Sequence, residues 1–198
     1  MIGYSDRVNH AFAFAAKHHD REVRKGTRLP YLTQPANVAV ILTRYGQPEE
    51  TVIAGILHDV VEDCVREGWT REMLEERIGA KFGAAVLDQS LAVARRRTDD
   101  DGVELSRDDV RADFLERLAQ ASDQARWVCA ADQVHDAGSL LADLRRTIDP
   151  DAVWGRASGG RDVTLHWYRG VRDRLAAVGF TAPIMTELTT LVEQLEKA

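Results

Sequence analysis

The feature that most constrains the fold of this chain is an apolar segment that carries four polar side chains within six residues. The segment reads Ala54-Gly55-Ile56-Leu57-His58-Asp59-Val60-Val61-Glu62-Asp63. On an α-helix, His58 lies one turn from Glu62 and Asp59 one turn from Asp63, so the four side chains form one polar strip. The apolar neighbours predict that much of this helix is buried, which disfavours the alternative of a solvated helix patch. Because buried carboxylates are costly unless they are paired or bind a cation, the segment predicts a cation or several basic partners.

Length and composition suit a single domain. A chain of 198 residues with 44% apolar residues can bury a full-sized core without a disulfide or a metal to hold it together. The formal net charge of −6 argues against a general nucleic-acid binder. Cys64 and Cys129 lie in apolar surroundings with no closely spaced Cys or His, so we expect buried thiols of a reducing compartment, not a disulfide or a zinc site. No signal segment and no membrane span are recognisable, which predicts a cytoplasmic protein without a membrane partner.

Helix signals recur along the chain, whereas strand-like alternation is absent. Ser5, Thr70 and Ser106 are suited to cap helices, and Pro48 is suited to open the helix that contains the polar strip. The pattern predicts an all-α bundle of about eight to ten helices. We expect one domain over residues 1–198, with the motif-bearing core at about 4–148 and C-terminal helices at about 161–197 packed on it.

The segment from Leu57 to Asp63 resembles the core motif of HD-domain metal phosphohydrolases. More narrowly, it is similar to the RelA/SpoT-type hydrolases of guanosine penta- and tetraphosphate and to the small alarmone hydrolases. The resemblance covers about residues 4–148 and implies an HD-domain helical bundle. It further implies that His58 and Asp59 are metal ligands, and that Glu62 and Asp63 are catalytic residues that orient a water or carry its proton.

Asp132 is an acidic residue between apolar helical turns, and it matches the distant Asp that HD hydrolases bring to the metal. The family wording there is close to Lys-x-x-Asp-x-x-x-Asn, and Asp136 stands where that pattern has Asn. The resemblance therefore implies that Asp132 is a metal ligand and that Asp136 contacts the substrate. The alternative for Asp132 is a surface carboxylate paired with Arg126 or Arg145.

The loop over 19–35 is similar to the family pattern His-x-Gly-Gln-x-Arg-Lys-x-x-x-x-Pro-Tyr-x-x-His-Pro. This similarity implies that Arg24 and Lys25 contact substrate phosphates and that Tyr31 packs beneath the site. A planar guanidinium and a mobile ammonium form a suitable pair for a flexible pyrophosphate. The alternative is a basic loop that is only solvated.

One position departs from the family pattern in a way that bears on metal binding. Gln34 stands where the family has its first ligand His, and a carboxamide offers only a weak oxygen donor. The predicted metal ligands are Gln34, His58, Asp59 and Asp132. This set should bind an ion more weakly than the family's set, which has a His at the first position. His18 or His19 is an alternative replacement for the missing imidazole.

The resemblance implies a metal-dependent phosphohydrolase that uses Mn²⁺, or another divalent cation such as Mg²⁺, and acts on a small-molecule nucleotide. The expected substrate is a guanosine 3′-pyrophosphate (ppGpp). Two alternatives stay open: a nucleoside monophosphate phosphatase, and a degenerate HD domain that binds a nucleotide or a partner without hydrolysis. The sequence leaves open the oligomeric state, a homo-oligomer included, and whether the run Arg95-Arg96-Arg97 contacts phosphates or is a solvated connector.

Overall fold

The computed structural model describes residues 5–24, 29–65, 68–99, 101–157 and 159–198. Over this part of the chain the secondary structure is helical, with two isolated β-bridges and no strand. The predicted all-α fold class is confirmed. The described residues form eleven helices, α1 Asp6–His18, α2 Thr33–Arg44, α3 Glu49–Leu57, α4 Val60–Asp63, α5 Arg71–Phe82, α6 Ala84–Val93, α7 Arg107–Gln120, α8 Asp123–Arg146, α9 Pro150–Arg156, α10 Gly160–Ala177 and α11 Ile184–Glu196.

Capping side chains fix the starts of several helices. The hydroxyls of Ser5, Thr70 and Ser106 each accept a hydrogen bond from the backbone N–H three residues further along, as the sequence predicted. Ser122 caps α8 in the same way, and this helix begins at Asp123.

The helix expected to carry the whole polar strip is divided at His58 and Asp59. Both residues keep right-handed helical dihedrals, and the N–H of Asp63 still donates to the carbonyl of Asp59 at 2.8 Å. The helical path therefore continues from α3 into the single turn of α4, with a distortion at the two predicted ligands. Every residue of α3 from Thr51 to Leu57 is buried, which confirms the prediction of a buried helix.

A glycine allows α2 and α3 to approach closely. A Cβ atom on Gly55 would lie 2.5 Å from Leu42 Cδ1 and 3.1 Å from Val38 Cγ1, so a larger residue would push the two helices apart. The close approach keeps Gln34, at the start of α2, next to the end of α3 where His58 lies.

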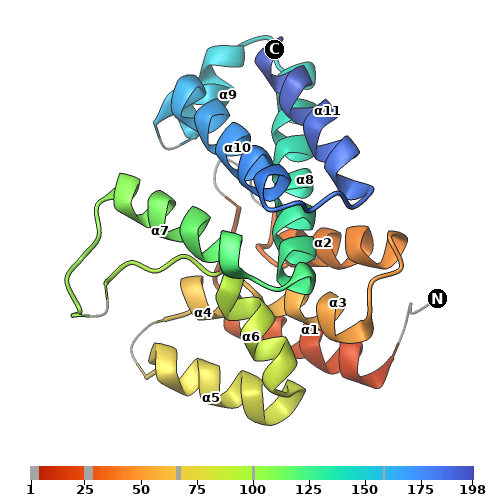
Figure 1. The fold of residues 1–198 in the computed structure, drawn as a ribbon, viewed down its shortest axis with the longest axis vertical. Helices are drawn as coiled ribbons and strands as arrows, with labels where there is room; N and C mark the ends of the chain where they lie inside the picture. The colour runs from red at the N-terminus through yellow and green to blue at the C-terminus, as the bar shows by residue number, and fades with distance from the viewer. Residues whose placement is uncertain (1–4, 25–28, 66–67, 100, 158) are drawn as a thin grey trace.

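Helix α8 links the two halves of the molecule and runs along its long axis, with α9, α10 and α11 gathered at one end (Figure 1). Its 24 residues correspond to about 36 Å of helix at 1.5 Å per residue. One part of α8 packs on α2, α3 and α6, and another packs on α11. This placement brings Asp132 of α8 to the junction of α3 and α4.

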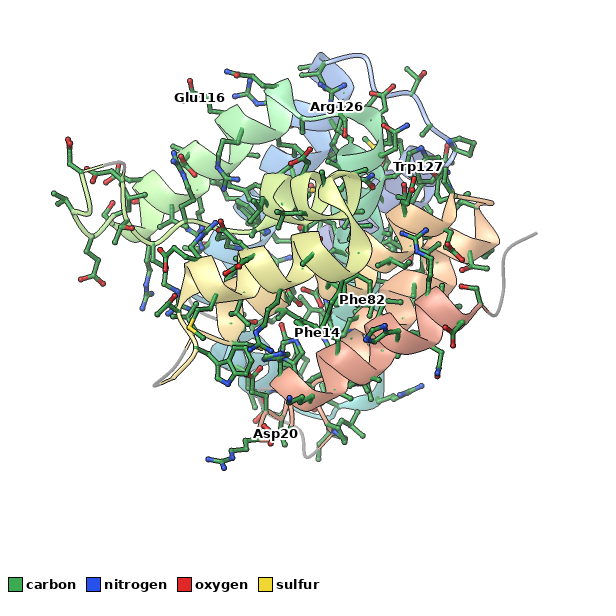
Figure 2. The ribbon with its side chains drawn as sticks, turned by 90° about the horizontal axis from the view of Figure 1, so that it is seen from below. Phe14, Asp20, Phe82, Glu116, Arg126 and Trp127 are labelled. Atoms are coloured by element: carbon green, nitrogen blue, oxygen red, sulfur yellow. The ribbon has the colours of Figure 1, made fainter. Side chains whose placement is uncertain are left out.

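The buried apolar residues form one contiguous core that runs from Val8 of α1 to Leu195 of α11. In the half away from the C-terminal helices, Phe14 of α1 and Phe82 of α5 meet edge to face with ring centroids 5.7 Å apart (Figure 2). The single domain expected over residues 1–198 stays a prediction. None of the helices in the described segments combines the length and the apolar composition of a membrane span.

The packing of α11 yields a stability prediction. Leu188 is fully buried, and Leu188→Ala should lower the free energy of unfolding by about 2–5 kcal/mol, because it removes buried methyl groups and leaves a cavity. Urea unfolding followed by circular dichroism measures the change. Glu193→Ala, on an exposed position of the same helix, should change it by less than about 0.5 kcal/mol. If the chain is a single domain, the whole helical signal of Leu188→Ala should be lost at a lower urea concentration than in the wild type. A variant that loses only a minor part of the signal at lower urea would contradict the single-domain prediction.

Candidate functional site

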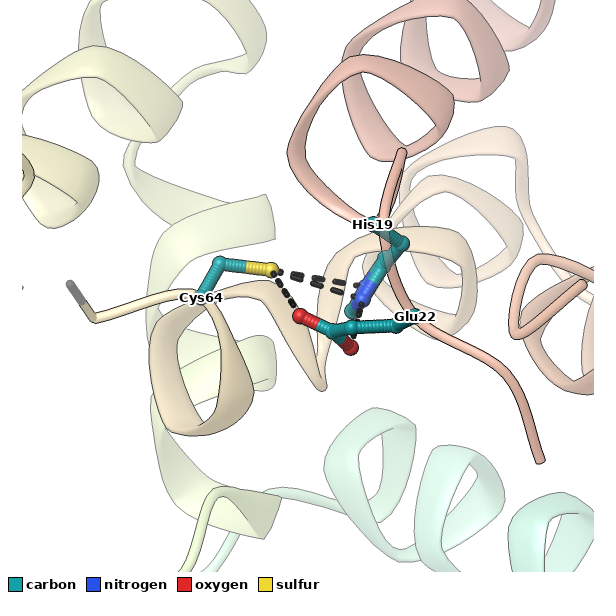
Figure 3. Close-up of side chains that lie close together, drawn as sticks. All are labelled: His19, Glu22 and Cys64. Carbon is teal, nitrogen blue, oxygen red and sulfur yellow. Dashed lines mark hydrogen bonds and ion pairs between the residues drawn. The ribbon is translucent and has the colours of Figure 1, made fainter. Parts of the chain in front are cut away.

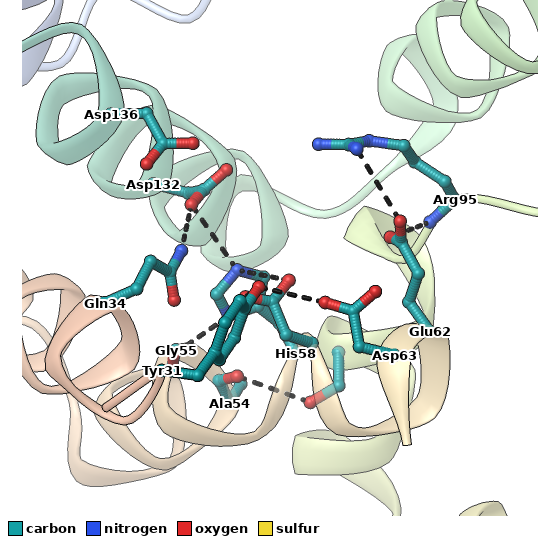
Figure 4. A network of polar contacts seen from close by, with 12 residues as sticks. Tyr31, Gln34, Ala54, Gly55, His58, Glu62, Asp63, Arg95, Asp132 and Asp136 are labelled. Atoms are coloured by element: carbon teal, nitrogen blue, oxygen red, sulfur yellow. Dashed lines mark hydrogen bonds and ion pairs between the residues drawn. The ribbon is translucent and has the colours of Figure 1, made fainter. Parts of the chain in front are cut away.

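His58 is held in the interior with one ring nitrogen directed at two carboxylates. The residue is 3% exposed, and its Nδ1 lies 2.9 Å from the carbonyl oxygen of Gly55, which fixes the ring and leaves Nε2 as the second donor position. Nε2 lies 3.2 Å from Asp59 Oδ1 and 3.6 Å from Asp132 Oδ1 (Figure 4). An imidazole nitrogen and two carboxylate oxygens thus approach one another from the α3–α4 junction and from α8, and donors of these types suit a divalent cation. The oxygens of Asp59 and Asp132 lie too far apart to contact one ion together, so these two side chains must move closer to share it.

The charges of His58, Asp59 and Asp132 strongly affect one another's pKa values. Burial alone would lower the pKa of His58, but the negative charges of Asp59 and Asp132 outweigh it and raise the pKa to about 10. Burial raises the pKa of Asp59, with further increases from Asp132 and Asp63. The protonated imidazole of His58 holds the pKa of Asp132 below its usual value, against the effect of burial. A proton on His58 therefore balances the carboxylates in the absence of an ion. A divalent cation bound by Nε2 would displace that proton, and its affinity would then rise with pH across the neutral range.

Tyr31 contributes more than the packing that the sequence predicted. Its hydroxyl lies 2.8 Å from Asp59 Oδ2 and 2.9 Å from Asp63 Oδ2, and burial together with these two carboxylates raises its pKa well above the usual value. The hydroxyl consequently stays protonated and holds Asp59 by the oxygen that does not face His58. Tyr31 thus orients a predicted ligand from beneath the site.

Gln34 lies at the predicted place, with its amide group against Asp132. Its Nε2 donates to Asp132 Oδ1, and its buried Oε1 has no hydrogen-bond partner among the described residues. A half-turn of the amide would present Oε1 in place of Nε2, since the two ends have nearly the same shape. In the orientation observed, Gln34 positions Asp132; in the other, it offers the weak oxygen ligand that the sequence suggested.

The alternative partners considered for these positions are engaged elsewhere. Arg126 pairs with Asp123, and Arg145 donates to Gln194, so neither pairs with Asp132 as the surface alternative required. His18 packs between the rings of Phe14 and Trp69. His19 faces a different set of side chains, which is described below.

Glu62 and Asp63 face the cavity beside the predicted ligands. Glu62 Oε2 accepts a hydrogen bond of 2.9 Å from the backbone N–H of Arg95, whose guanidinium lies 3.6 Å from Oε1. Burial raises the pKa of Glu62, and the charge of Arg95 opposes the shift. Arg97 lies 3.9 Å from Asp63. The sequence alone did not indicate which of the three consecutive arginines points into the cavity. In the structure Arg95 lines the cavity and lies beside Glu62.

Arg24 joins the loop to α8. Its guanidinium lies 2.8 Å from His135 Nε2 and 3.1 Å from Asp136 Oδ1, so two residues predicted to contact substrate are brought together. Burial and the nearby charge of Asp132 raise the pKa of Asp136 to about 7, although Arg24 opposes this. His135 was not predicted to belong to the site. Lys25 lies outside the described residues.

These side chains surround a cavity of about 580 Å³. Its described lining residues carry six carboxylates and two guanidinium groups, so an anionic ligand would meet a repulsive field without a bound cation. A second cavity of about 460 Å³ lies beside it and shares Arg24 and Asp136 with it. The walls of the first cavity are formed by Glu22, Val23, Arg24, Tyr31, Gln34, Asp59, Glu62, Asp63, Arg95, Asp132 and Asp136.

Comparison with curated proteins finds relatives that are much longer than this chain. A guanosine-3′,5′-bis(diphosphate) 3′-pyrophosphohydrolase of Aquifex aeolicus is 36% identical over 83 residues, which cover 42% of this chain and 11% of that protein. A GTP pyrophosphokinase rsh of Brucella melitensis biotype 1 is 26% identical over an alignment that covers 94% of this chain and 27% of that protein. The chain thus spans roughly a tenth to a quarter of the length of these relatives.

Solved structures and family models agree on the fold. A metazoan ortholog of SpoT that hydrolyzes ppGpp superimposes with a TM-score of 0.74 over 98% of both chains at 24% identity. The protein lmo0812 of Listeria monocytogenes EGD-e gives a TM-score of 0.68 at 27% identity, covering 83% of this chain and 99% of the other. The model of the HD domain family matches residues 11–151, which include His58, Asp59 and Asp132. This chain belongs to the HD domain family.

Proposed function

We propose that this protein is a metal-dependent phosphohydrolase that acts on a nucleotide, with a guanosine 3′-pyrophosphate as its substrate. The observation that carries the proposal is that the buried Nε2 of His58 lies close to one oxygen each of Asp59 and Asp132, two residues that line an acidic cavity. The similarity to the Aquifex aeolicus pyrophosphohydrolase and to the metazoan SpoT ortholog supports the choice of substrate.

Mn²⁺ is the ion we assign to this site, held by His58, Asp59 and Asp132, because the donor set mixes one imidazole with hard carboxylate oxygens and contains no thiolate. When bound, such an ion polarises a phosphoryl oxygen and lowers the pKa of water, so that hydroxide is available near neutral pH. Tyr31 and Gln34 hold the two carboxylates in place through their hydrogen bonds.

Glu62 is the group we assign to proton transfer. It lies in the same cavity as the predicted ligands, and its raised pKa makes it a stronger base than an ordinary glutamate. The backbone N–H of Arg95 fixes Oε2, which leaves Oε1 as the oxygen that can take a proton from an attacking water. Asp63 shares the hydroxyl of Tyr31 with Asp59 and sets the position of this part of the cavity wall.

We propose that the nucleotide extends from the acidic cavity into the second cavity beside it. Arg24 stands between the two cavities and offers a planar set of donors to phosphate oxygens. Leu140, Arg146 and Tyr168 line the second cavity, which has an apolar part for a base and a basic part for further phosphates. Its volume of about 460 Å³ falls within the usual size of a small-molecule site.

The competing function is that of an HD domain that binds a nucleotide without hydrolysis. Two observations favour it: the amide nitrogen of Gln34 faces Asp132 where the family pattern has an imidazole ligand, and Asp136 places a carboxylate where the pattern has an amide. The experiments below separate hydrolysis from binding.

The first prediction concerns the ligand role of Gln34. Gln34→His should tighten Mn²⁺ binding by about tenfold or more, because an imidazole nitrogen replaces a weak oxygen donor at the edge of the site. Isothermal titration of the chelator-treated protein with Mn²⁺ measures the change. Gln47→His, on a partly buried residue beyond the end of α2, serves as the matched control and should leave the affinity unchanged. Equal affinities for wild type and Gln34→His would exclude residue 34 from the ligands.

The second prediction concerns proton transfer by Glu62. Glu62→Gln should retain Mn²⁺ and reduce turnover by about 100-fold or more, because the amide cannot accept the proton. Turnover is followed as pyrophosphate release from a panel containing guanosine 3′,5′-bis(diphosphate) and nucleoside monophosphates. Glu76→Gln, on the exposed side of α5, is the control and should match the wild type.

Each outcome of this panel is informative. Pyrophosphate release from the guanosine bis(diphosphate) supports the proposal, whereas phosphate release from the monophosphates alone would replace it with a phosphatase. Tight nucleotide binding with no turnover in the presence of Mn²⁺ would establish the binding function instead. Full turnover by Glu62→Gln would remove Glu62 from the mechanism.

A further inference from the structure

A second group of metal-binding side chains lies next to the site, and we call His19, Glu22 and Cys64 the His19 cluster. His19 follows the end of α1, Glu22 lies in the loop after it, and Cys64 ends α4, so residues 45 positions apart are brought together (Figure 3). Cys64 Sγ lies 3.4 Å from His19 Nδ1 and 3.8 Å from Glu22 Oε1, and Nδ1 lies 2.8 Å from Glu22 Oε2.

The cluster is buried on one side and accessible on the other. The side chain of His19 is fully buried and Cys64 is 1% exposed, whereas 28% of the Glu22 side chain is exposed. Glu22 also lines the 580 Å³ cavity. An ion can therefore reach the cluster from the cavity while the imidazole and the thiol hold it from the interior.

The side chains must rearrange to bind a tetrahedral ion. Cys64 Sγ lies 3.4 Å from His19 Nδ1 and 3.8 Å from Nε2, so the sulfur lies over the face of the imidazole ring, and the ring or the thiol must turn before both can contact one ion. Zinc bond lengths of about 2.0–2.3 Å place neighbouring ligand atoms about 3.4–3.6 Å apart in a tetrahedron. The distances from sulfur to Nδ1 and to Glu22 Oε1, 3.4 and 3.8 Å, bracket this range. The 2.8 Å contact between His19 and Glu22 is shorter because the two atoms share a proton, so the Glu22 carboxylate must move by roughly half an ångström.

The donor chemistry differs from that of the first site. A thiolate, an imidazole and a carboxylate form a set that Zn²⁺ and similar borderline ions prefer, whereas the His58 site contains no sulfur. We infer that the His19 cluster is a second cation site, which binds Zn²⁺ through Cys64 Sγ, His19 Nδ1 and a Glu22 oxygen, with its fourth position open to the cavity. Binding releases the thiol proton and the proton shared by His19 and Glu22 to solvent.

The cluster is connected to the first site through Tyr31. The ring of Tyr31 stacks on His19 with centroids 4.7 Å apart, and its hydroxyl holds Asp59 and Asp63. An ion on His19 would fix this stack together with the loop after α1, and thereby fix the orientation of Asp59. The inference concerns the ion alone and does not depend on the proposed hydrolysis.

Cobalt binding to the full chain tests the inference, because a Co²⁺ ion that takes a thiolate ligand shows a sulfur-to-metal charge-transfer band. Chelator-treated wild type should develop this band, with a final intensity that corresponds to one thiolate-bound Co²⁺ per chain, and added Zn²⁺ should remove it. Cys64→Ser should abolish the band. Cys129→Ser, at the other buried thiol, and His58→Ala, at the first site, should both retain it.

A wild-type protein that binds Co²⁺ without the band, or a Cys64→Ser protein that keeps it, would show that the cluster is only hydrogen bonded. Loss of the band in Cys129→Ser would show that the thiolate ligand is Cys129 on α8, which would overturn the assignment. Glu22→Gln tests the site independently if Cys64→Ser misfolds. This variant should retain the circular dichroism of the wild type. It should weaken Zn²⁺ binding by about tenfold or more, since a carboxamide is a poor ligand. Unchanged affinity in that variant would also contradict the site.

Discussion

The rest of the structure depends on one constraint: oppositely charged side chains are buried where α8 meets the α3–α4 junction. These side chains are His58, Asp59 and Asp132. An imidazole and two carboxylates are removed from water there, which is costly unless each finds a partner. The hydrogen bond that His58 donates to the carbonyl of Gly55, and those that Tyr31 and Gln34 donate to Asp59 and Asp132, offset part of this cost. The helices that provide these partners are packed so closely that a Cβ atom at Gly55 of α3 would force the side chain of Leu42 on α2 to shift.

The same arrangement explains how an acidic cavity can serve an anionic ligand. Six carboxylates line it, and burial keeps the pKa values of Asp59, Glu62 and Asp136 above their usual range. Burial is the largest cause of each increase in pKa, and the neighbouring carboxylates add to it. In the function we propose, a divalent cation at His58 would add positive charge to this cavity and so favour an anionic substrate.

Much of the fold followed from local signals in the sequence. The caps at Ser5, Thr70 and Ser106 and the buried helix before His58 are set by residues within one or two turns, which is why they were predictable. The break between α3 and α4 was not, because it depends on what the side chains of His58 and Asp59 meet on other helices.

The predicted site residues meet in one place, apart from Lys25, which lies outside the described residues. Local sequence could not show which arginine after α6 turns inward, or that His135 approaches Arg24. The His19 cluster was missed for a related reason. Its members are 45 positions apart in the chain, and sequence spacing detects metal sites only where the ligands are close together.

The most direct test of the account is the affinity for Mn²⁺ of a protein that carries Asp132→Asn, measured by equilibrium dialysis beside His58→Ala. Asp143→Asn, on the same helix and half exposed, provides the control for the loss of one charge from α8. If α8 and the α3–α4 junction hold one ion together, Asp132→Asn and His58→Ala should each weaken binding by about 100-fold or more, and the control should bind as the wild type does. Wild-type affinity in Asp132→Asn would contradict the shared site.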